Sequence, residues 1–342
     1  MSICFFETSD SDRAYLESRL PGEVLEFHRE PLTSTEQAAE LCRDAEIISV
    51  FVHSKVDKDV ISAIPGLKFI ATRSTGYDHL DVVSAAHHGV GVSNVPTYGE
   101  NTVAEHAFAL LLAVSRNICK AHVRASSGDF SLEGLSGFDL KGRTIGIVGV
   151  GHIGSHIVRI AKGFGMSVLA CDPVQDQTLA DVLGFAYTDL TDLLNRSDIV
   201  SLNAPLTPAT HHLIGWHNIQ EFKKGAVLIN TARGALVDTG ALLHALDSGI
   251  LSAAGLDVLE GEENLSEESH LLGASVTQEG LRVALQNLAL LRRHDLVITP
   301  HIGFDSAEAC ERILATTVEN IQAYRRDVPK NLVNANTESG NG

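Results

Sequence analysis

Short apolar runs alternate with longer segments of mixed polarity along most of the chain. In the first part of the chain, the apolar runs predict strands and the segments between them predict helices. The strands are expected at 3–6, 46–52, 68–71 and 90–93, and helices, for example, at 56–63 and 80–88. Strands rich in Ile, Val and Leu that alternate with helices are typical of βαβ units, so the pattern predicts a parallel sheet covered on both faces.

A second series of the same kind begins at residue 144. Its strands are expected at 144–150, 167–171, 199–202, 226–230, 253–258 and 296–299. The remaining segments predict one long helix at 101–122, a Gly- and Ser-rich loop at 126–142, a last helix at 306–325 and a mobile polar tail from residue 334. Together the two series predict an α/β protein with two doubly wound parallel-sheet domains.

Composition agrees with this picture and narrows the class of partner. The 342 residues are 44% hydrophobic and 20% charged, which is typical of a globular chain of about two domains. Lys and Arg number 26 and Asp and Glu 43, so the formal net charge is −17. This charge repels phosphate backbones and anionic lipids, and we expect neither nucleic acid nor membrane as a partner. A small anionic substrate would need a local cation.

The cysteines and the N-terminus predict a soluble, cytoplasmic protein. The number of cysteines is odd, their spacings are wide and no CxxC pair occurs, so free thiols in a reducing compartment are expected. No signal peptide is visible, and the longest apolar run is far shorter than the ~20 residues of a membrane span. The five cysteines are Cys4, Cys42, Cys119, Cys171 and Cys310.

A glycine-rich segment at 144–154 has the spacing GxGxxG at Gly149, Gly151 and Gly154. It follows a predicted strand and opens a predicted helix at 155–164, which is the context of a dinucleotide-binding turn. Gly149 would permit the tight turn, Gly151 the approach of a pyrophosphate, and Gly154 close packing of helix and strand. The helix N-terminus would add N–H donors and partial positive charge. A turn that serves packing alone is the alternative.

Asp172 ends the next predicted strand, 18 residues after Gly154. A carboxylate at this place can accept hydrogen bonds from both hydroxyls of the adenosine ribose, and it repels a 2′-phosphate. The segment 172–176, Asp-Pro-Val-Gln-Asp, contains no Lys or Arg that could bind such a phosphate. The sequence therefore predicts NAD rather than NADP as the cofactor.

Three reactive residues follow three later strands. They are Arg233 in Asn-Thr-Ala-Arg-Gly, Glu262 in an acidic loop that also holds Glu260 and Glu263, and His301 in Thr-Pro-His-Ile-Gly-Phe. In open α/β sheets, ligands bind beyond the carboxyl ends of the strands, so these positions suit catalysis. Each residue taken alone could be a surface or structural side chain. The three together indicate a catalytic site.

Arg233 would grip a substrate carboxylate with two hydrogen bonds and polarise the neighbouring carbonyl. His301 would donate a proton to the carbonyl oxygen as hydride arrives, while a carboxylate on its other ring nitrogen orients the imidazole. The other histidines, among them His106 and the pairs at 87–88 and 211–212, carry no positional signal. Adjacent pairs make poor metal clamps and no HExxH occurs, so we predict no metal site.

From about residue 73 to residue 324, the combined motifs resemble the D-isomer-specific 2-hydroxyacid dehydrogenase family. The resemblance implies that Arg233 is the substrate arginine and His301 the acid–base residue. It also implies that Glu262, five residues past Asp257, is the partner of the histidine, and that Glu260 is not.

The family's fold implies a Rossmann NAD-binding domain, here 101–302, inserted into a flavodoxin-like lid and substrate domain, here 1–100 plus 303–342. It also implies an active site in the cleft between them and a homodimer formed through the helix predicted at 101–122. The remaining expected contacts come from motif matches. Thr75, Gly76, Tyr98 and Phe304 are expected to contact the substrate. The expected cofactor contacts are Gly149, Gly151, His152, Ile153, Gly154, Asp172, Ala204, Pro205, Thr210, Thr231, Ala232, Arg233 and Asp257.

Two details favour the D-lactate dehydrogenase branch, namely the long insert between Glu262 and Asp295 and the aromatic Phe304. The role of the insert at 263–295 stays open. Asn203 departs from many relatives, which have histidine there, and this is expected to alter a cofactor contact. The first interpretation is reduction of pyruvate by NADH to D-lactate. Glycerate, hydroxyisocaproate or phosphite are alternative substrates. An NAD-sensing corepressor is a further alternative, which the acidic chain and the lack of extra tails disfavour.

Overall fold

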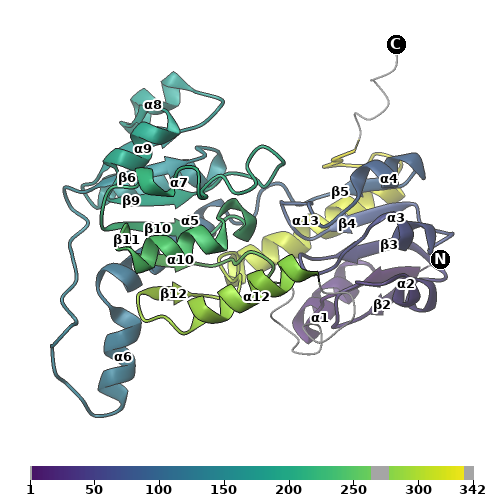
Figure 1. The fold of residues 1–342 in the computed structure, drawn as a ribbon. Helices are drawn as coiled ribbons and strands as arrows, with labels where there is room; N and C mark the ends of the chain where they lie inside the picture. Colours follow the sequence, from purple (N-terminus) through teal and green to yellow (C-terminus); the bar gives the residue numbers. More distant parts are fainter. Residues whose placement is uncertain (1, 263–276, 335–342) are drawn as a thin grey trace. The chain divides into compact units, whose positions relative to one another are not determined.

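The computed structural model describes residues 2–262 and 277–334 and divides into two compact units (Figure 1). The discontinuous unit comprises Met1–Tyr98 and Ser306–Gly342, and the inserted unit comprises Gly99–Asp305. The domain limits expected at residues 100 and 303 stay predictions. No helix in the described stretches is long and apolar enough to cross a membrane.

The discontinuous unit is built on five parallel strands in the order β2-β1-β3-β4-β5, which is the flavodoxin-like order. Successive residues of a strand point to opposite faces of the sheet. Ile3 and Phe5 therefore lie in one hydrophobic core, and Cys4 and Phe6 lie in a separate core on the other face. Its elements are β1 (Ser2–Phe5), α1 (Asp10–Arg19), β2 (Val24–Phe27), α2 (Thr35–Leu41), β3 (Ala45–Val50), α3 (Lys58–Ser62), β4 (Phe69–Thr72), α4 (Val82–His87), β5 (Gly91–Ser93) and α13 (Ala307–Arg325).

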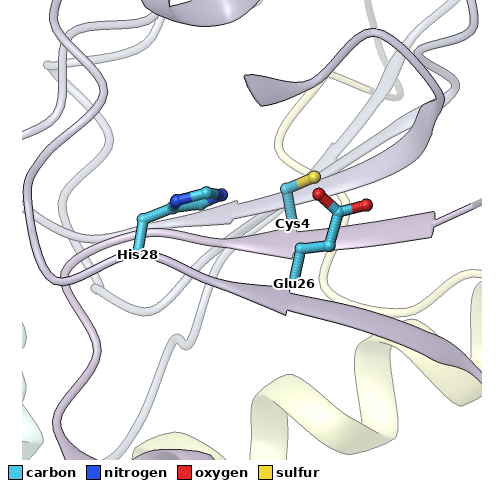
Figure 2. Close-up of side chains that lie close together, drawn as sticks. All are labelled: Cys4, Glu26 and His28. Atoms are coloured by element: carbon cyan, nitrogen blue, oxygen red, sulfur yellow. The ribbon is translucent and has the colours of Figure 1, made fainter. Parts of the chain in front are cut away.

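The edge strand β2 was not predicted, because Val-Leu-Glu-Phe is short and only partly buried. It pairs in parallel with β1, and the register places Glu26 beside Cys4. Figure 2 shows the side chains of these two residues on the same side of the strands. The helix predicted at 306–325 is confirmed as α13, which begins after the capping Ser306. The side chain of Asn334, the first residue of the predicted tail, accepts the N–H of Val92 in β5 and donates to the carbonyl of Val90, which precedes the strand. Residues 335–342 lie outside the described residues.

The inserted unit is built on seven parallel strands in the order β12-β11-β10-β9-β6-β7-β8. This is the doubly wound Rossmann order with one further strand at the edge, so the predicted fold class is confirmed. Its elements are α5 (Glu100–Ser115), α6 (Ile118–Ser126), β6 (Thr144–Val148), α7 (His152–Gly163), β7 (Ser167–Cys171), α8 (Gln177–Leu183), β8 (Ala186–Tyr187), α9 (Leu190–Arg196), β9 (Ile199–Leu202), η1 (Ile219–Glu221), β10 (Ala226–Asn230), η2 (Gly234–Leu236), α10 (Thr239–Asp247), β11 (Leu251–Leu256), α12 (Gln278–Leu291) and β12 (Leu296–Ile298).

The single helix predicted at 101–122 is wrong, because the structure has two helices there, α5 and α6. Asn117 adopts a left-handed backbone conformation with φ 52°, which ends the first helix and redirects the chain. The apolar side of α5, including Phe108 and Leu111, is buried in the core of the inserted unit. In contrast, α6 has no buried residue.

Candidate active site

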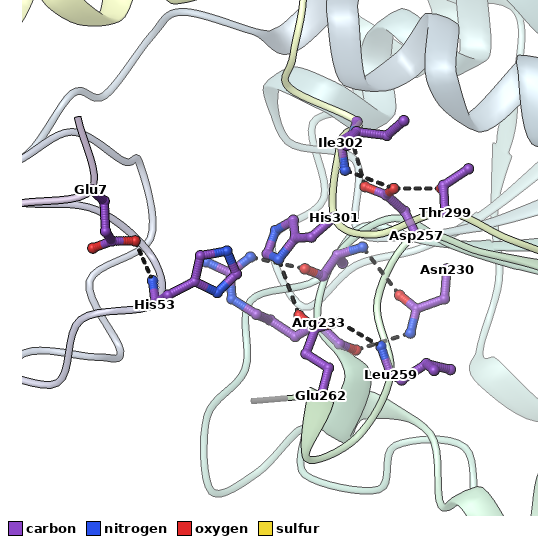
Figure 3. Close-up of polar contacts among 12 residues, drawn as sticks. Glu7, His53, Asn230, Arg233, Asp257, Leu259, Glu262, Thr299, His301 and Ile302 are labelled. Atoms are coloured by element: carbon purple, nitrogen blue, oxygen red, sulfur yellow. Dashed lines mark hydrogen bonds and ion pairs between the residues drawn. The ribbon is translucent and has the colours of Figure 1, made fainter. Parts of the chain in front are cut away.

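The loops after β10, β11 and β12 carry the three reactive residues predicted from the sequence (Figure 3). These strands are neighbours in the sheet and parallel, so their carboxyl ends share one edge. Arg233 follows the end of β10, Glu262 follows β11 and His301 follows β12. The sheet order therefore brings together residues that lie far apart in the sequence.

His301 and Glu262 form a direct pair. Nδ1 of His301 lies 3.1 Å from Oε1 of Glu262, and Oε2 of Glu262 accepts the N–H of Leu259 at 2.9 Å (Figure 3). An ionised carboxylate only accepts hydrogen bonds, so Nδ1 carries a proton in this pair and Nε2 is left for another partner. The ring of Phe304 lies edge-on to the imidazole, with 6.4 Å between centroids.

The backbone at His301 is left-handed, with φ 53°, which is uncommon for a residue other than glycine. Asp257 holds it in place. Its carbonyl accepts the N–H of His301 at 2.8 Å. Its carboxylate accepts the N–H of Ile302 at 3.0 Å (Figure 3) and that of Gly303 at 2.8 Å. A Cβ atom at Gly303 would lie 2.8 Å from this carboxylate, so the close approach depends on glycine.

The Asp257 side chain is only 1% exposed and also binds His106 and Thr299. Burial raises the pKa of Asp257, but hydrogen bonds from His106, Thr299 and the Gly303 N–H outweigh it, so the pKa lies below its ordinary value. The hydroxyl of Thr299 donates to Asp257 at 2.6 Å, so Nε2 of His106, 3.0 Å from that hydroxyl, is a donor. The predicted contact of Asp257 with the cofactor stays a prediction.

Sequence reasoning missed His106, because it belongs to α5 and carries no motif. Only the packing of α5 beside β12 brings its ring to the end of that strand.

Arg233 lies in a turn fixed by the side-chain amide of Asn230. This amide donates to the carbonyl of Arg233 at 2.9 Å and accepts the N–H of Ala232 at 3.1 Å. The guanidinium is half-buried, and its Nη1 donates to the carbonyl of Ala232 at 2.8 Å. A Cβ atom at Gly234 would lie 2.1 Å from the backbone of Leu259. Glycine therefore allows the arginine loop to contact the loop that carries Glu262.

Glu260 is paired elsewhere, as the resemblance implied. Its carboxylate lies 2.6 Å from Nε2 of His212 and accepts the hydroxyl of Thr239 at 2.8 Å. The side chain of Asn287 in α12 donates to the carbonyl of Glu260 at 2.7 Å. The described part of the insert therefore supports the loop that carries Glu262. Residues 263–276 lie outside the described residues.

The glycine-rich turn follows β6 and leads into α7. Gly149 has φ 91°, and a Cβ atom on it would lie 2.8 Å from the carbonyl oxygen of Asn203. A Cβ atom on Gly154 would lie 2.1 Å from the carbonyl oxygen of Gly149, whereas one on Gly151 would meet nothing within 4 Å. The fold itself requires two of the glycines, and Gly151 leaves open space where the sequence predicts a pyrophosphate.

Asp172 follows β7 and joins this turn. One carboxylate oxygen accepts the N–H of Val150 at 2.7 Å, and the other accepts that of Val174 at 2.8 Å. His152 and Ile153 open α7, so its N-terminal N–H groups lie next to the turn. The half-buried carboxylate keeps lone pairs for ribose hydroxyls.

The other predicted cofactor residues follow β9 and β10. Thr210 donates its hydroxyl to the carbonyl of Pro205 at 2.6 Å, which closes the loop that begins at Ala204. The hydroxyl oxygen of Thr231, next to Ala232, and Oδ1 of Asn203 are buried and have no hydrogen-bond partner among the described residues. Buried polar atoms almost always have a partner, so these orphaned atoms at the carboxyl ends of β9 and β10 fit a bound dinucleotide.

In the discontinuous unit, the loop after β4 contains Thr75 and Gly76. The hydroxyl of Thr75 donates to the carbonyl of Val95 at 2.8 Å, and the side chain of Asn94 donates to the carbonyl of Thr75 at 2.7 Å. No described residue accepts the backbone N–H groups of Thr75 and Gly76. The loop therefore presents two unused donors. Tyr98 is half-buried, and its carbonyl accepts Nε of Arg312 at 2.6 Å.

The guanidinium of Arg73 is buried and makes its hydrogen bonds within the discontinuous unit. It donates to the carbonyl of Phe6, to that of Glu7 at 2.8 Å and to the hydroxyl of Ser49 at 3.1 Å. The carboxylate of Glu7 in turn accepts the N–H of His53 at 2.9 Å (Figure 3). Arg73 is thus a structural side chain and cannot serve as a second anion-binding cation.

One edge of the inserted sheet thus carries an oriented imidazole, a half-buried guanidinium and a dinucleotide-type turn. Such a set can hold a carboxylate, exchange a proton with a neighbouring oxygen and place a nicotinamide cofactor beside it.

Comparison with known proteins agrees with this chemistry. Residues 108–303 match the model of the D-isomer specific 2-hydroxyacid dehydrogenase NAD binding domain. The chain is 34% identical to D-lactate dehydrogenase of Escherichia coli (strain K12), over 94% of this chain and 96% of that protein. It is 37% identical to glyoxylate reductase of Thermococcus litoralis, over 86% of this chain and 85% of that protein.

Among solved structures, D-lactate dehydrogenase from Aquifex aeolicus, complexed with NAD and lactic acid, has a TM-score of 0.88 and 34% identity, with 97% of this chain and 99% of that chain covered. The chain therefore belongs to the D-isomer specific 2-hydroxyacid dehydrogenase family, and it is an NAD-dependent oxidoreductase of 2-hydroxy and 2-oxo acids.

Proposed function

We propose that this enzyme reduces pyruvate to D-lactate with NADH, and that Arg233, Glu262 and His301 are its catalytic residues. The observation that carries the proposal is the His301–Glu262 pair, at 3.1 Å, on the sheet edge that also bears Arg233. The pair fixes the proton on Nδ1 and leaves Nε2 as the nitrogen that serves the substrate.

Bound NADH supplies the hydride that adds to the carbonyl carbon. The Gly149–Gly154 turn, Asp172 and Thr231 would hold it through the N–H groups, carboxylate and orphaned hydroxyl described above. Protonated His301 donates its Nε2 proton to the carbonyl oxygen as negative charge develops there. Glu262 stabilises the imidazolium before this transfer and keeps the ring in the same orientation after it.

Arg233 holds the substrate carboxylate. Within the discontinuous unit, Thr75 and Gly76 keep the unused backbone N–H groups that the resemblance assigns to substrate binding. Phe304, whose ring lies edge-on to the imidazole of His301, would limit the space beside the carbonyl to a small apolar group. Tyr98 stays the aromatic substrate contact that the resemblance implies for the discontinuous unit. Arg73 is buried and donates to backbone carbonyls and to the hydroxyl of Ser49, so it is not available to a second anionic group of the substrate. Phosphorylated acids are therefore poor substrates.

Glyoxylate is a second candidate substrate, because the relative from Thermococcus litoralis, at 37% identity, is a glyoxylate reductase. Glyoxylate lacks the methyl group of pyruvate. One methyl group in an apolar pocket is worth only about 1–3 kcal/mol of discrimination, so the two acids are expected to differ by roughly 10- to 200-fold in kcat/KM.

The experiment is a substrate panel with NADH, followed as loss of its absorbance. Pyruvate, 2-oxobutyrate, glyoxylate and hydroxypyruvate are compared by kcat/KM, and D- and L-lactate are compared in the reverse direction with NAD. Pyruvate is expected to rank first, with moderate turnover of 2-oxobutyrate, and D-lactate is expected to be oxidised in preference to L-lactate. A higher value for glyoxylate or hydroxypyruvate would reject the D-lactate assignment, and preference for L-lactate would reject the proposed stereochemistry.

We also propose a homodimer formed through α6 and the loop that follows it. The sequence predicts an interface through the apolar helix at 101–122, but Phe108, Leu110 and Leu111 of this segment are buried in the inserted unit. The exposed apolar side chains lie further along. Phe130 and Leu132 are 80% and 83% exposed, and Ile118 and Val123 on α6 are also exposed. Large apolar side chains exposed in this way favour contact with a second copy.

A further inference from the structure

Three metal-ligating side chains meet on one face of the β1–β2 pair, in the discontinuous unit. Cys4 and Glu26 are direct partners in the parallel ladder, and His28 follows Glu26 by two residues. Residues two apart along a strand point to the same face, so the register alone groups a thiol, a carboxylate and an imidazole. Figure 2 shows the three side chains on the same side of the two strands.

Their ligand atoms all lie within 4.8 Å of one another. Tetrahedral zinc, with bonds of about 2.0–2.3 Å, places its ligand atoms about 3.5 Å apart. Small side-chain rotations would therefore close the group around one ion. A neutral imidazole, a thiolate and a carboxylate also form a ligand set that zinc accepts, and the two anions balance its charge.

The ligand atoms have few competing partners. The carboxylate of Glu26 makes no hydrogen bond or ion pair with any described residue, and Nε2 of His28 is buried without a partner. The thiol of Cys4, which is fully buried, shares a hydrogen bond with the thiol of Cys42, donates to the carbonyl of Leu41 at 3.5 Å and lies 3.9 Å from the hydroxyl of Ser2. A buried orphaned nitrogen beside an unpaired carboxylate is the arrangement that a cation would satisfy.

We propose that Cys4, Glu26 and His28 bind one zinc ion, whose fourth position is open to water. The ion would tie the edge strand β2 to β1 and stabilise the discontinuous unit, and it takes no part in hydride transfer. The sequence predicts no metal site, because Cys4, Glu26 and His28 do not belong to a known metal-binding motif. Only the pairing of β1 with β2 brings Cys4 to the other two ligands.

A second group, His211, His212 and Glu260, is also close enough to hold an ion. There, however, His212 and Glu260 already bond to each other at 2.6 Å, and Glu260 accepts a hydrogen bond from Thr239. We therefore assign the ion to the β1–β2 group, and the test removes the second group with His211→Gln.

The test uses the full chain, reduced and stripped of metal with a chelator, in the His211→Gln background. Zinc is titrated in competition with a chromophoric chelator. We expect one zinc per chain, and at least tenfold weaker binding after His28→Gln or Glu26→Gln. The matched control His217→Gln, which changes an exposed histidine of the inserted unit, should leave the affinity unchanged. Absence of stoichiometric binding, or equal loss in the control, would overturn the proposal.

Cobalt tests the thiol ligand by spectroscopy, first in the wild-type chain. Cobalt bound by the wild-type chain is expected to show a thiolate-to-cobalt charge-transfer band. This band should be retained in Cys119→Ser, which changes an exposed cysteine, and lost in Cys4→Ser. Binding without the band would overturn the proposal, as would a disulfide of Cys4 with Cys42 that persists under reducing conditions and excludes the ion. Because both readouts measure metal binding, they are independent of the enzyme's substrate.

Discussion

Asp257 and Glu262 both act on His301, but through different atoms. Asp257 accepts backbone N–H groups of the turn and so fixes the strained main chain at His301. Glu262 contacts only the imidazole of this residue, through Nδ1. Loss of the first contact is therefore expected to affect stability, and loss of the second to affect the proton transfer.

Glu262→Gln tests the role of the charge. Glutamine keeps the shape and one acceptor oxygen, but it no longer stabilises a charged imidazole. We expect kcat for reduction to fall on the order of 10²-fold, while NADH binding stays unchanged. The matched control is Glu260→Gln in the same loop, which removes the ion pair with His212. It should lower the melting temperature and change kcat by only a few-fold. Equal kcat values for the two variants would contradict the assignment.

Asp257→Asn tests the buried carboxylate. It should lower the free energy of unfolding by about 1.5–3 kcal/mol, because charge-assisted hydrogen bonds are lost. The pKa of Asp257 in the folded chain lies below its ordinary value of about 3.9, so the stabilisation is complete above that pH and disappears as pH falls through the folded value.

Denaturant unfolding at several pH values measures this effect. The gap in unfolding free energy between wild type and Asp257→Asn should be constant above about pH 5 and should narrow below about pH 4. Asp181→Asn, at an exposed position on α8, is the control and should show no such gap. A gap that grows in acid would contradict the lowered pKa.

At the scale of elements, the turn between β6 and α7 separates two uses of glycine. Gly154 is needed because the first turn of the helix packs against the carbonyl of Gly149. The position of Gly151 is open in the protein alone, so a side chain there meets only what binds to the turn.

Gly151→Ala and Gly154→Ala separate these two roles. Gly151→Ala should keep the wild-type melting temperature without ligand but weaken NADH binding at least tenfold, because the methyl group occupies the space predicted for the pyrophosphate. Gly154→Ala should lower the unfolding free energy by about 1–3 kcal/mol through steric overlap. Thermal unfolding and fluorescence titration with NADH measure both effects. Unchanged NADH affinity in Gly151→Ala would contradict the predicted site of the pyrophosphate.

At the scale of the whole molecule, the net charge of −17 repels an anionic substrate, so its binding depends on hydrogen-bond donors and cations at the site. Among the described residues of the inserted unit, Arg233 is the cation predicted to bind an anionic substrate. Assembly is a second property of the whole molecule, because Ile118 and Val123 of α6 and Phe130 and Leu132 of the following loop are exposed.

The double variant Phe130→Ser with Leu132→Ser tests assembly. Wild-type protein is expected to be a dimer by light scattering at micromolar concentration, and the double variant should dissociate, because the apolar area that drives association is lost. Val182→Ser, which changes an exposed apolar residue on α8, should remain a dimer. A monomeric wild-type chain would refute the proposed interface.

Much of the fold could be predicted because its signals are local. Apolar runs gave the central strands of both sheets, and the spacing of Gly149, Gly151, Gly154 and Asp172 indicated the dinucleotide turn. Strands β2 and β8 were missed, because β2 is partly exposed and β8 has only two residues. The break between α5 and α6 was missed because it depends on the backbone of Asn117, which apolar periodicity does not report.

The sequence by itself determined the alternation of elements, the acidic charge and the identity of the residues that follow each strand. These properties depend on residue type and on neighbours along the chain. Only the tertiary structure decided that Glu260 contacts His212, that His106 and Thr299 support Asp257, and that Cys4 meets Glu26 and His28. Such contacts depend on strand order and register, which local residue preferences do not specify, because the free energy that selects them comes from burial and pairing between distant segments.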